Sequence, residues 1–166
     1  DLVRSRGLGD VYKRQELNNI AEKFVANFKM PVELEDVRFT GSLANYNWSL
    51  YSDLDLHIVV DFATVSENEA WVKSFFDEAR MDWNNTNDIK IEGFEVEIYV
   101  ENVGDTHHSG GVYSVLRDEW IEEPEPYEGE IDFGTARKKS DDLSTQINLI
   151  RHIVDAGNFE AALKSI

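Results

Sequence analysis

The fold is decided by residues 53–60, DLDLHIVV, together with the shorter segment 37–40, VRFT, and the Gly41-Ser42 pair that follows it. In the longer stretch the apolar positions 54, 56, 58 and 60 alternate with a second set of positions, which is the period of a strand with two different faces. The segment 37–40 is β-prone, and Gly41 ends it in a loop that runs to Tyr51. The pattern therefore predicts a central strand preceded by a short strand and a loop.

Helices are predicted before and after this strand pair along the chain. Apolar residues recur at a spacing of three to four from Glu16 to Phe28, and a proline follows soon after. Ser66 and Glu69 have the spacing of a capping box. The helix behind this box is predicted to cover the sheet with a buried stripe that includes Trp71, Phe75, Phe76 and Trp83.

The remaining strands and the domain boundaries follow from alternation and from turn residues. Residues 89–91 and 94–100 are typical of two strands around Gly93, and residues 112–121 of a further extended segment. We therefore predict an α/β (α+β) fold with a mixed sheet, helices packed on one side and additional C-terminal helices. The expected parts are a domain at 16–121, an acidic linker at 122–134 and a C-terminal helical segment at 135–166, which we expect to be truncated.

Residues 1–15 resemble a translated sequencing-adapter segment of the kind found at the ends of metagenomic reading frames. We expect this segment to be non-native, and it does not enter the prediction of the fold.

Composition limits the classes of function. The chain has 33 acidic and 16 basic residues and a formal net charge of −17, which disfavours extended binding to a nucleic-acid backbone and favours small substrates. Cysteine is absent, so disulfides and thiolate chemistry are excluded. We expect no membrane span, because no run of about 18 apolar residues occurs. A cytoplasmic location, in a bacterium or a phage-infected host cell, is the expectation.

Acidic residues at strand spacing point to a metal site. Alternate residues of a strand face the same way, so Asp53 and Asp55 project from one face, about 7 Å apart at Cα, and both can reach one cation. Glu97 is the predicted third ligand, because it stands between apolar residues of a neighbouring strand. Glu95, on the same face, is the alternative.

Gly41 and Ser42 supply a second kind of group. A glycine lets backbone amides approach phosphate oxygens closely, and a serine hydroxyl adds a hydrogen-bond donor. Alone this pair means little. Followed by a gap of ten residues and by Asp-x-Asp at the start of an apolar strand, it becomes a compound pattern.

Phe39-Thr40-Gly41-Ser42 followed by Asp53-Leu54-Asp55-Leu56 resembles the motif of the nucleotidyltransferase superfamily that includes DNA polymerase β. The surrounding residues are similar to those of the short predicted nucleotidyltransferases of tailed phages. The resemblance covers roughly residues 37–121, and its third acid, Glu97, stands where Asp is more usual.

The resemblance implies the minimal nucleotidyltransferase fold and an activity. A nucleoside monophosphate would pass from a nucleoside triphosphate such as ATP to a hydroxyl acceptor, with release of pyrophosphate. Asp53, Asp55 and Glu97 would be catalytic and would hold Mg²⁺ or Mn²⁺, with two ions expected, while Gly41 and Ser42 would bind the nucleotide. A catalytically inactive nucleotide-binding or antitoxin-like module of the same fold is the alternative. Neither the acceptor nor the base preference can be inferred from the sequence.

Histidines give weaker signals. His57 shares a strand face with the aspartates and is a candidate for supporting the metal ligands. His107 and His108 lie in a loop that bears Gly and Ser, where they are candidates for lining the pocket or for binding a transition metal, although adjacent side chains seldom share one ion.

Overall fold

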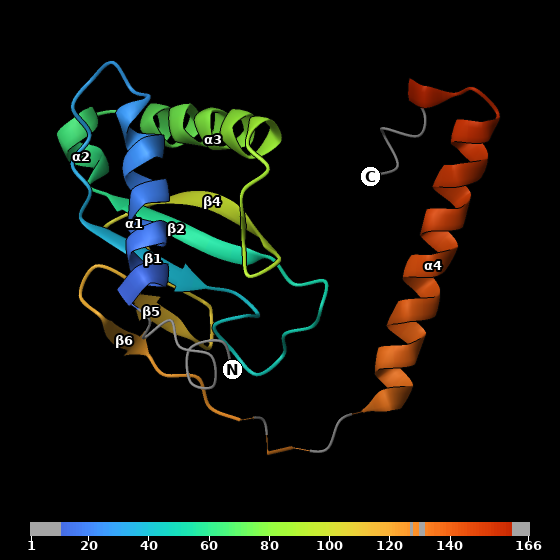
Figure 1. Ribbon diagram of the computed structural model, residues 1–166. Helices are drawn as coiled ribbons and strands as arrows, with labels where there is room; N and C mark the ends of the chain where they lie inside the picture. The colour runs from blue at the N-terminus through green and yellow to red at the C-terminus, as the bar shows by residue number, and fades with distance from the viewer. Residues whose placement is uncertain (1–10, 127, 130–131, 161–166) are drawn as a thin grey trace. The chain divides into compact units, whose positions relative to one another are not determined.

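A computed structural model describes residues 11–126, 128–129 and 132–160, and these divide into two compact units between residues 127 and 128. The first unit carries a sheet with helices beside it, and the second carries one long helix (Figure 1). Along the chain the elements are α1 (Val11–Ala26), β1 (Asp36–Thr40), β2 (Leu54–Val60), α2 (Phe62–Val65), α3 (Glu69–Thr86), β3 (Lys90–Ile91), β4 (Phe94–Asn102), β5 (Val112–Ser114), β6 (Glu119–Glu122) and α4 (Phe133–Asp155).

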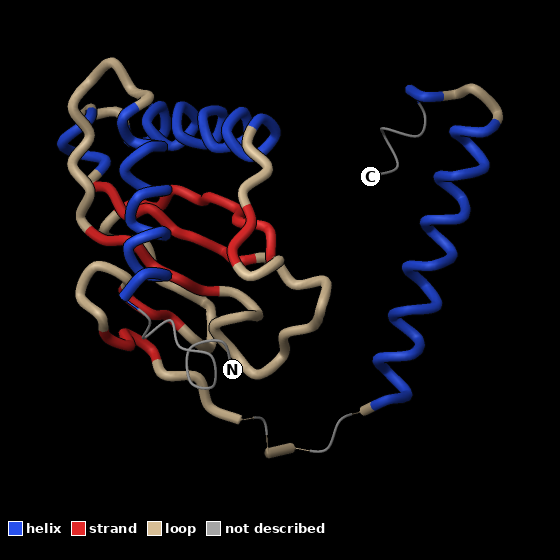
Figure 2. The backbone as a smooth tube through the Cα atoms, in the orientation of Figure 1, coloured by secondary structure: helices blue, strands red, loops and turns tan. Residues whose placement is uncertain are grey.

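The six strands form one mixed sheet in the order β3-β4-β2-β1-β5-β6 (Figure 2). The β2–β4 pair is parallel, and every other pair is antiparallel. A parallel pair needs a long connection, and α2 and α3 lie in the connection from β2 to β4. The prediction of an α+β fold with a mixed sheet is therefore confirmed.

One face of the sheet is covered by helices, because apolar residues alternate with polar residues along its strands and lie mainly on that face. Leu56 and Ile58 of β2 and Ile98 of β4 are fully buried, and they share one core with Phe24 of α1 and Phe76 of α3. On the opposite face, Asp55 and His57 of β2 and Glu97, Tyr99 and Glu101 of β4 are polar and half-buried. The strand period of two thus separates a core face from a face that is available for chemistry.

The edge of β4 beyond its short pairing with β3 is closed by a side chain. Asn84 of α3 donates its amide N–H to the Ile98 carbonyl at 3.0 Å and accepts the Ile98 N–H at 3.0 Å. One side chain thus replaces the two hydrogen bonds that a neighbouring strand would make at this residue. The same contact fixes α3 along β4.

Several boundaries differ from the predictions. The first helix begins at Val11 rather than Glu16, so it includes part of the segment predicted to be non-native, whose residues 1–10 lie outside the described residues. The predicted capping box is wrong, because Asn68 rather than Ser66 caps α3, its side chain accepting the Trp71 N–H. Trp71 is 51% exposed and is not a core residue.

The C-terminal part follows the predictions more loosely. The extended segment 112–121 is a hairpin of β5 and β6, and α4 begins at Phe133, inside the predicted linker. Gly157, with φ of 78°, follows α4. The predicted last helix falls largely outside the described residues. Within the described ranges, no helix combines the length and the apolar character needed to cross a membrane.

Replacement of Asn84 by alanine is expected to lower the free energy of unfolding by about 1–3 kcal/mol, because the Ile98 amide and carbonyl lose their partners at a half-buried edge. Chemical denaturation measures the change. Asn85→Ala is the matched control: Asn85 is exposed on the same turn of α3, and its loss should stay within about 0.5 kcal/mol. Equal losses in the two variants would contradict the role assigned to Asn84.

Candidate functional site

The candidate site is built on the parallel pairing of β2 and β4. In this register Asp55 lies directly beside Glu97, and both belong to the half-buried polar face. Two carboxylates on adjacent strands are close enough to share a cation. β2 and β4 are inner strands of the sheet, and the two carboxylates alternate along these strands with the buried core residues.

Asp53 completes the group from the residue before β2. It is exposed, and its charge acts on Asp55 together with that of Glu97. Burial is the main cause that raises the pKa of Asp55 from its ordinary value of 3.8 to about 6. His57 opposes this rise, and the two like charges add to it. A divalent cation would relieve this repulsion, and the all-oxygen donor set suits Mg²⁺.

Glu95 has different surroundings from Glu97. It is exposed and lies opposite Lys90 of β3, near the edge of the sheet, whereas Glu97 lies beside Asp55. The Tyr99 hydroxyl donates a hydrogen bond of 2.6 Å to Glu97 Oε2. That bond raises the pKa of Tyr99 and fixes the carboxylate of Glu97 while its other oxygen stays outside the bond.

Gly41 lies against the Asp55 side chain. Its φ of 75° is in the left-handed region that favours glycine, and Thr40 before it pairs with Asp55 across β1 and β2. A Cβ added at residue 41 would overlap Oδ2 of Asp55 and lie 2.7 Å from its Cγ. No other residue type fits here without displacing that carboxylate.

The loop after Gly41 ends close to where it begins. Ser42 donates its hydroxyl to the Ser52 hydroxyl at 2.8 Å, and Ser52 also accepts the Ser49 N–H at 2.9 Å. Ser42 and Asp53 are therefore held near each other at the two ends of the loop. The structure thus brings together all the predicted site residues: Gly41, Ser42, Asp53, Asp55 and Glu97.

The polar face continues along the strands to Glu101, which the sequence prediction missed. Glu101 of β4 contacts His57 at 3.1 Å and His107 at 2.7 Å, and it also pairs with Arg38 of β1. His57 stacks on Tyr99 with ring centroids 5.0 Å apart. The signal for Glu101 was present, because residues 95, 97, 99 and 101 share one face of the strand. By contrast, His108 is exposed.

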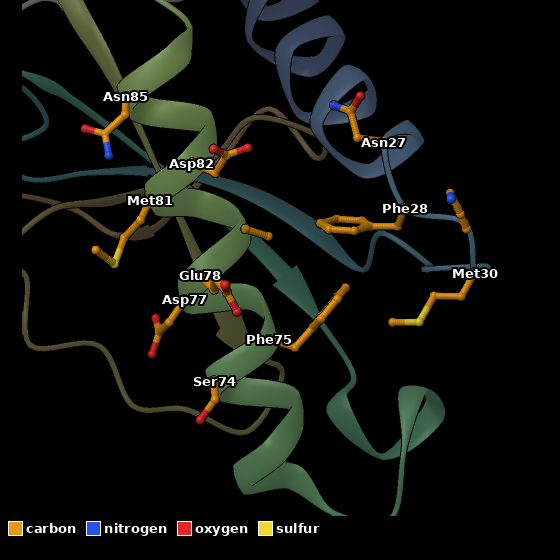
Figure 3. A pocket seen from close by; sticks show the side chains of 12 residues that line it. Asn27, Phe28, Met30, Ser74, Phe75, Asp77, Glu78, Met81, Asp82 and Asn85 are labelled. Carbon is orange, nitrogen blue, oxygen red and sulfur yellow. The ribbon is translucent and has the colours of Figure 1, made fainter.

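A cavity of about 1050 Å³ lies elsewhere, against α3 and the segment after α1 (Figure 3). Phe28, Met30 and Phe75 line its apolar part, and Glu78 and Asp82 add negative charge. None of the five predicted site residues lines it. The cavity is therefore separate from the carboxylate group of Asp53, Asp55 and Glu97, which is the candidate site that the sequence predicts.

Comparison with family models, curated proteins and solved structures found no match for this chain.

Gly41→Ala is expected to destabilise the protein and to weaken Mn²⁺ binding. Alanine pays about 1–2 kcal/mol for a left-handed backbone, and here its Cβ must also displace Asp55. Gly93→Ala is the matched control, since Gly93 has φ of 92° and open space around it. Urea unfolding and Mn²⁺ titration of both variants measure the difference. Mn²⁺ binding by Gly41→Ala at the level of Gly93→Ala would contradict the close approach.

Asp55 is expected to make stability fall as pH rises from about 4 to about 6 in the absence of metal. Its pKa is raised to about 6 in the folded protein, so the folded protein binds the proton more tightly than the unfolded chain, and each step of pH through this window favours unfolding. Denaturation of wild type and Asp55→Asn in chelator across this range measures the effect. Asp55→Asn should gain stability relative to wild type as pH rises, and a constant gap would disprove the shift.

Proposed function

We propose that this protein is a metal-dependent nucleotidyltransferase, which transfers a nucleoside monophosphate from a nucleoside triphosphate to a hydroxyl acceptor and releases pyrophosphate. The observation that carries the proposal is the position of Asp55, between the bare backbone of Gly41 and the carboxylate of Glu97. The sequence resemblance to the polymerase β-like superfamily points to the same reaction.

Each residue has a role that its surroundings allow. Asp53, Asp55 and Glu97 would hold Mg²⁺ or Mn²⁺, which supplies Lewis-acid stabilisation of charge on the triphosphate and the leaving pyrophosphate. Gly41 leaves room for the Asp55 carboxylate beside its backbone, and the Ser42 hydroxyl, which donates to Ser52 in this structure, would turn to donate to a phosphate oxygen. Glu97 is placed to help remove the proton of the acceptor hydroxyl, because one of its oxygens lies outside the Tyr99 hydrogen bond.

The charge of the chain fits a small substrate. With a net charge of −17, the protein would repel a long polyanion, whereas a triphosphate brings its own divalent cations. We therefore propose a small molecule, a protein side chain or a single nucleic-acid end as the hydroxyl acceptor, rather than a duplex held along its length.

Asp55→Asn and Glu97→Gln are each expected to reduce Mg²⁺-dependent release of pyrophosphate by about a hundredfold or more, because a lost carboxylate weakens the cation site. The assay supplies labelled nucleoside triphosphates and host-cell extract as the source of acceptor, and it follows both pyrophosphate and the molecule that gains the label.

Glu95→Gln is the matched control, two residues from Glu97 on the same strand but opposite Lys90. It should keep most of the wild-type rate. Wild-type turnover in Asp55→Asn would disprove the proposed function. Calorimetric binding of a triphosphate with Mg²⁺, without pyrophosphate release under any condition, would instead favour the inactive nucleotide-binding module.

A further inference from the structure

Two imidazoles converge on one carboxylate beyond the Asp55 and Glu97 pair. His57 Nδ1 lies 3.1 Å from Glu101 Oε2, and His107 Nε2 lies 2.7 Å from Glu101 Oε1. The three ligand atoms all lie within 4.8 Å of one another. They come from β2, from β4 and from the loop before β5, so only the tertiary structure brings them together.

We propose that His57, Glu101 and His107 form a binding site for a divalent transition metal, with Zn²⁺ as the ion of best fit. Two imidazole nitrogens and one carboxylate oxygen are a donor set that zinc accepts in proteins. Around four-coordinate zinc with bonds of about 2.0–2.2 Å, neighbouring ligand atoms lie roughly 3.3–3.6 Å apart. The two contacts with Glu101, at 3.1 and 2.7 Å, are shorter than this value, and all three ligand atoms lie within 4.8 Å of one another, so small side-chain rotations bring them to it.

The proton balance of binding is simple. Because a carboxylate oxygen accepts hydrogen bonds, each histidine would carry an N–H on the nitrogen that faces Glu101. When the metal takes that position, the facing nitrogen of each neutral imidazole gives its proton to water and the other ring nitrogen takes one from water. No net proton is released, and no further reactant is needed.

A supporting shell already holds the three ligands. Arg38 Nη1 donates to Glu101 Oε1 at 2.7 Å, which leaves Oε2 for the metal, and buried Asp36 lies 3.4 Å from Arg38 Nε and offsets its charge. Burial opposes ionisation of Glu101, but its contacts with the two histidines outweigh burial and lower its pKa. Such outer partners fix the orientation of metal ligands.

The site has room for a further ligand. A cavity of about 520 Å³ is lined by His57, Glu101 and His107, and also by Tyr99 and Arg80. A water molecule or an oxygen of a bound molecule can therefore take a fourth position on the metal, as in zinc sites with three protein ligands. The nitrogen donors separate this site from the all-oxygen site at Asp55, which favours Mg²⁺.

The decisive experiment is calorimetric titration of the tag-free full chain with ZnCl₂ in the Asp55→Asn background, which weakens the carboxylate site. We expect one equivalent of Zn²⁺ per chain and a rise in melting temperature. Adding His107→Ala should weaken Zn²⁺ binding at least about tenfold and remove the rise. His57→Ala should act in the same direction, and circular dichroism checks that each variant is folded.

His108→Ala in the same background is the matched control, because His108 is exposed and adjacent to His107. It should keep the Zn²⁺ affinity within about twofold. The proposal is overturned if Zn²⁺ does not bind, if His107→Ala binds as tightly as its parent, or if His108→Ala loses as much as His107→Ala. The trio would then be a hydrogen-bond network around Glu101. Pyrophosphate release in wild type is a separate readout, so this result does not depend on the proposed function.

Discussion

The close contact between Gly41 and the Asp55 carboxylate is the constraint on which the site depends. Pairing of β1 with β2 brings Thr40 beside Asp55, so the next residue turns over that side chain. A left-handed backbone and a missing Cβ are both needed at this point, and only glycine supplies both at low cost. The contact sets the start of the loop, and the Ser42–Ser52 hydrogen bond holds its end.

The parallel register of β2 and β4 distributes the chemistry along one face. Asp55 lies beside Glu97, His57 lies beside Tyr99, and Glu101 follows one step later, where it contacts both His57 and Arg38. The same alternation places Leu56 and Ile98 in the core. Carboxylates and imidazoles are thus neighbours on one surface, while apolar residues pack on the other.

Local signals predicted some elements and failed at others for identifiable reasons. The alternation in 53–60 predicts β2 well, because burial of one face imposes the period of two. Ser66 has the spacing of a helix cap but ends α2 instead, and Asn68 takes the cap, a choice that a few tenths of a kcal/mol can decide. Trp71 matches the helical stripe yet is 51% exposed, and its ring stacks on Phe75.

By itself, the sequence determined that a glycine-serine turn precedes a strand opening with two aspartates, because these signals are local in the chain. It also placed Glu97 on a polar strand face. The tertiary structure alone decided that Glu97, rather than Glu95, lies beside Asp55, because that depends on strand register. It likewise decided that residues 57, 101 and 107 meet, since parallel pairing and the fold of a loop are set by contacts between segments far apart in the chain.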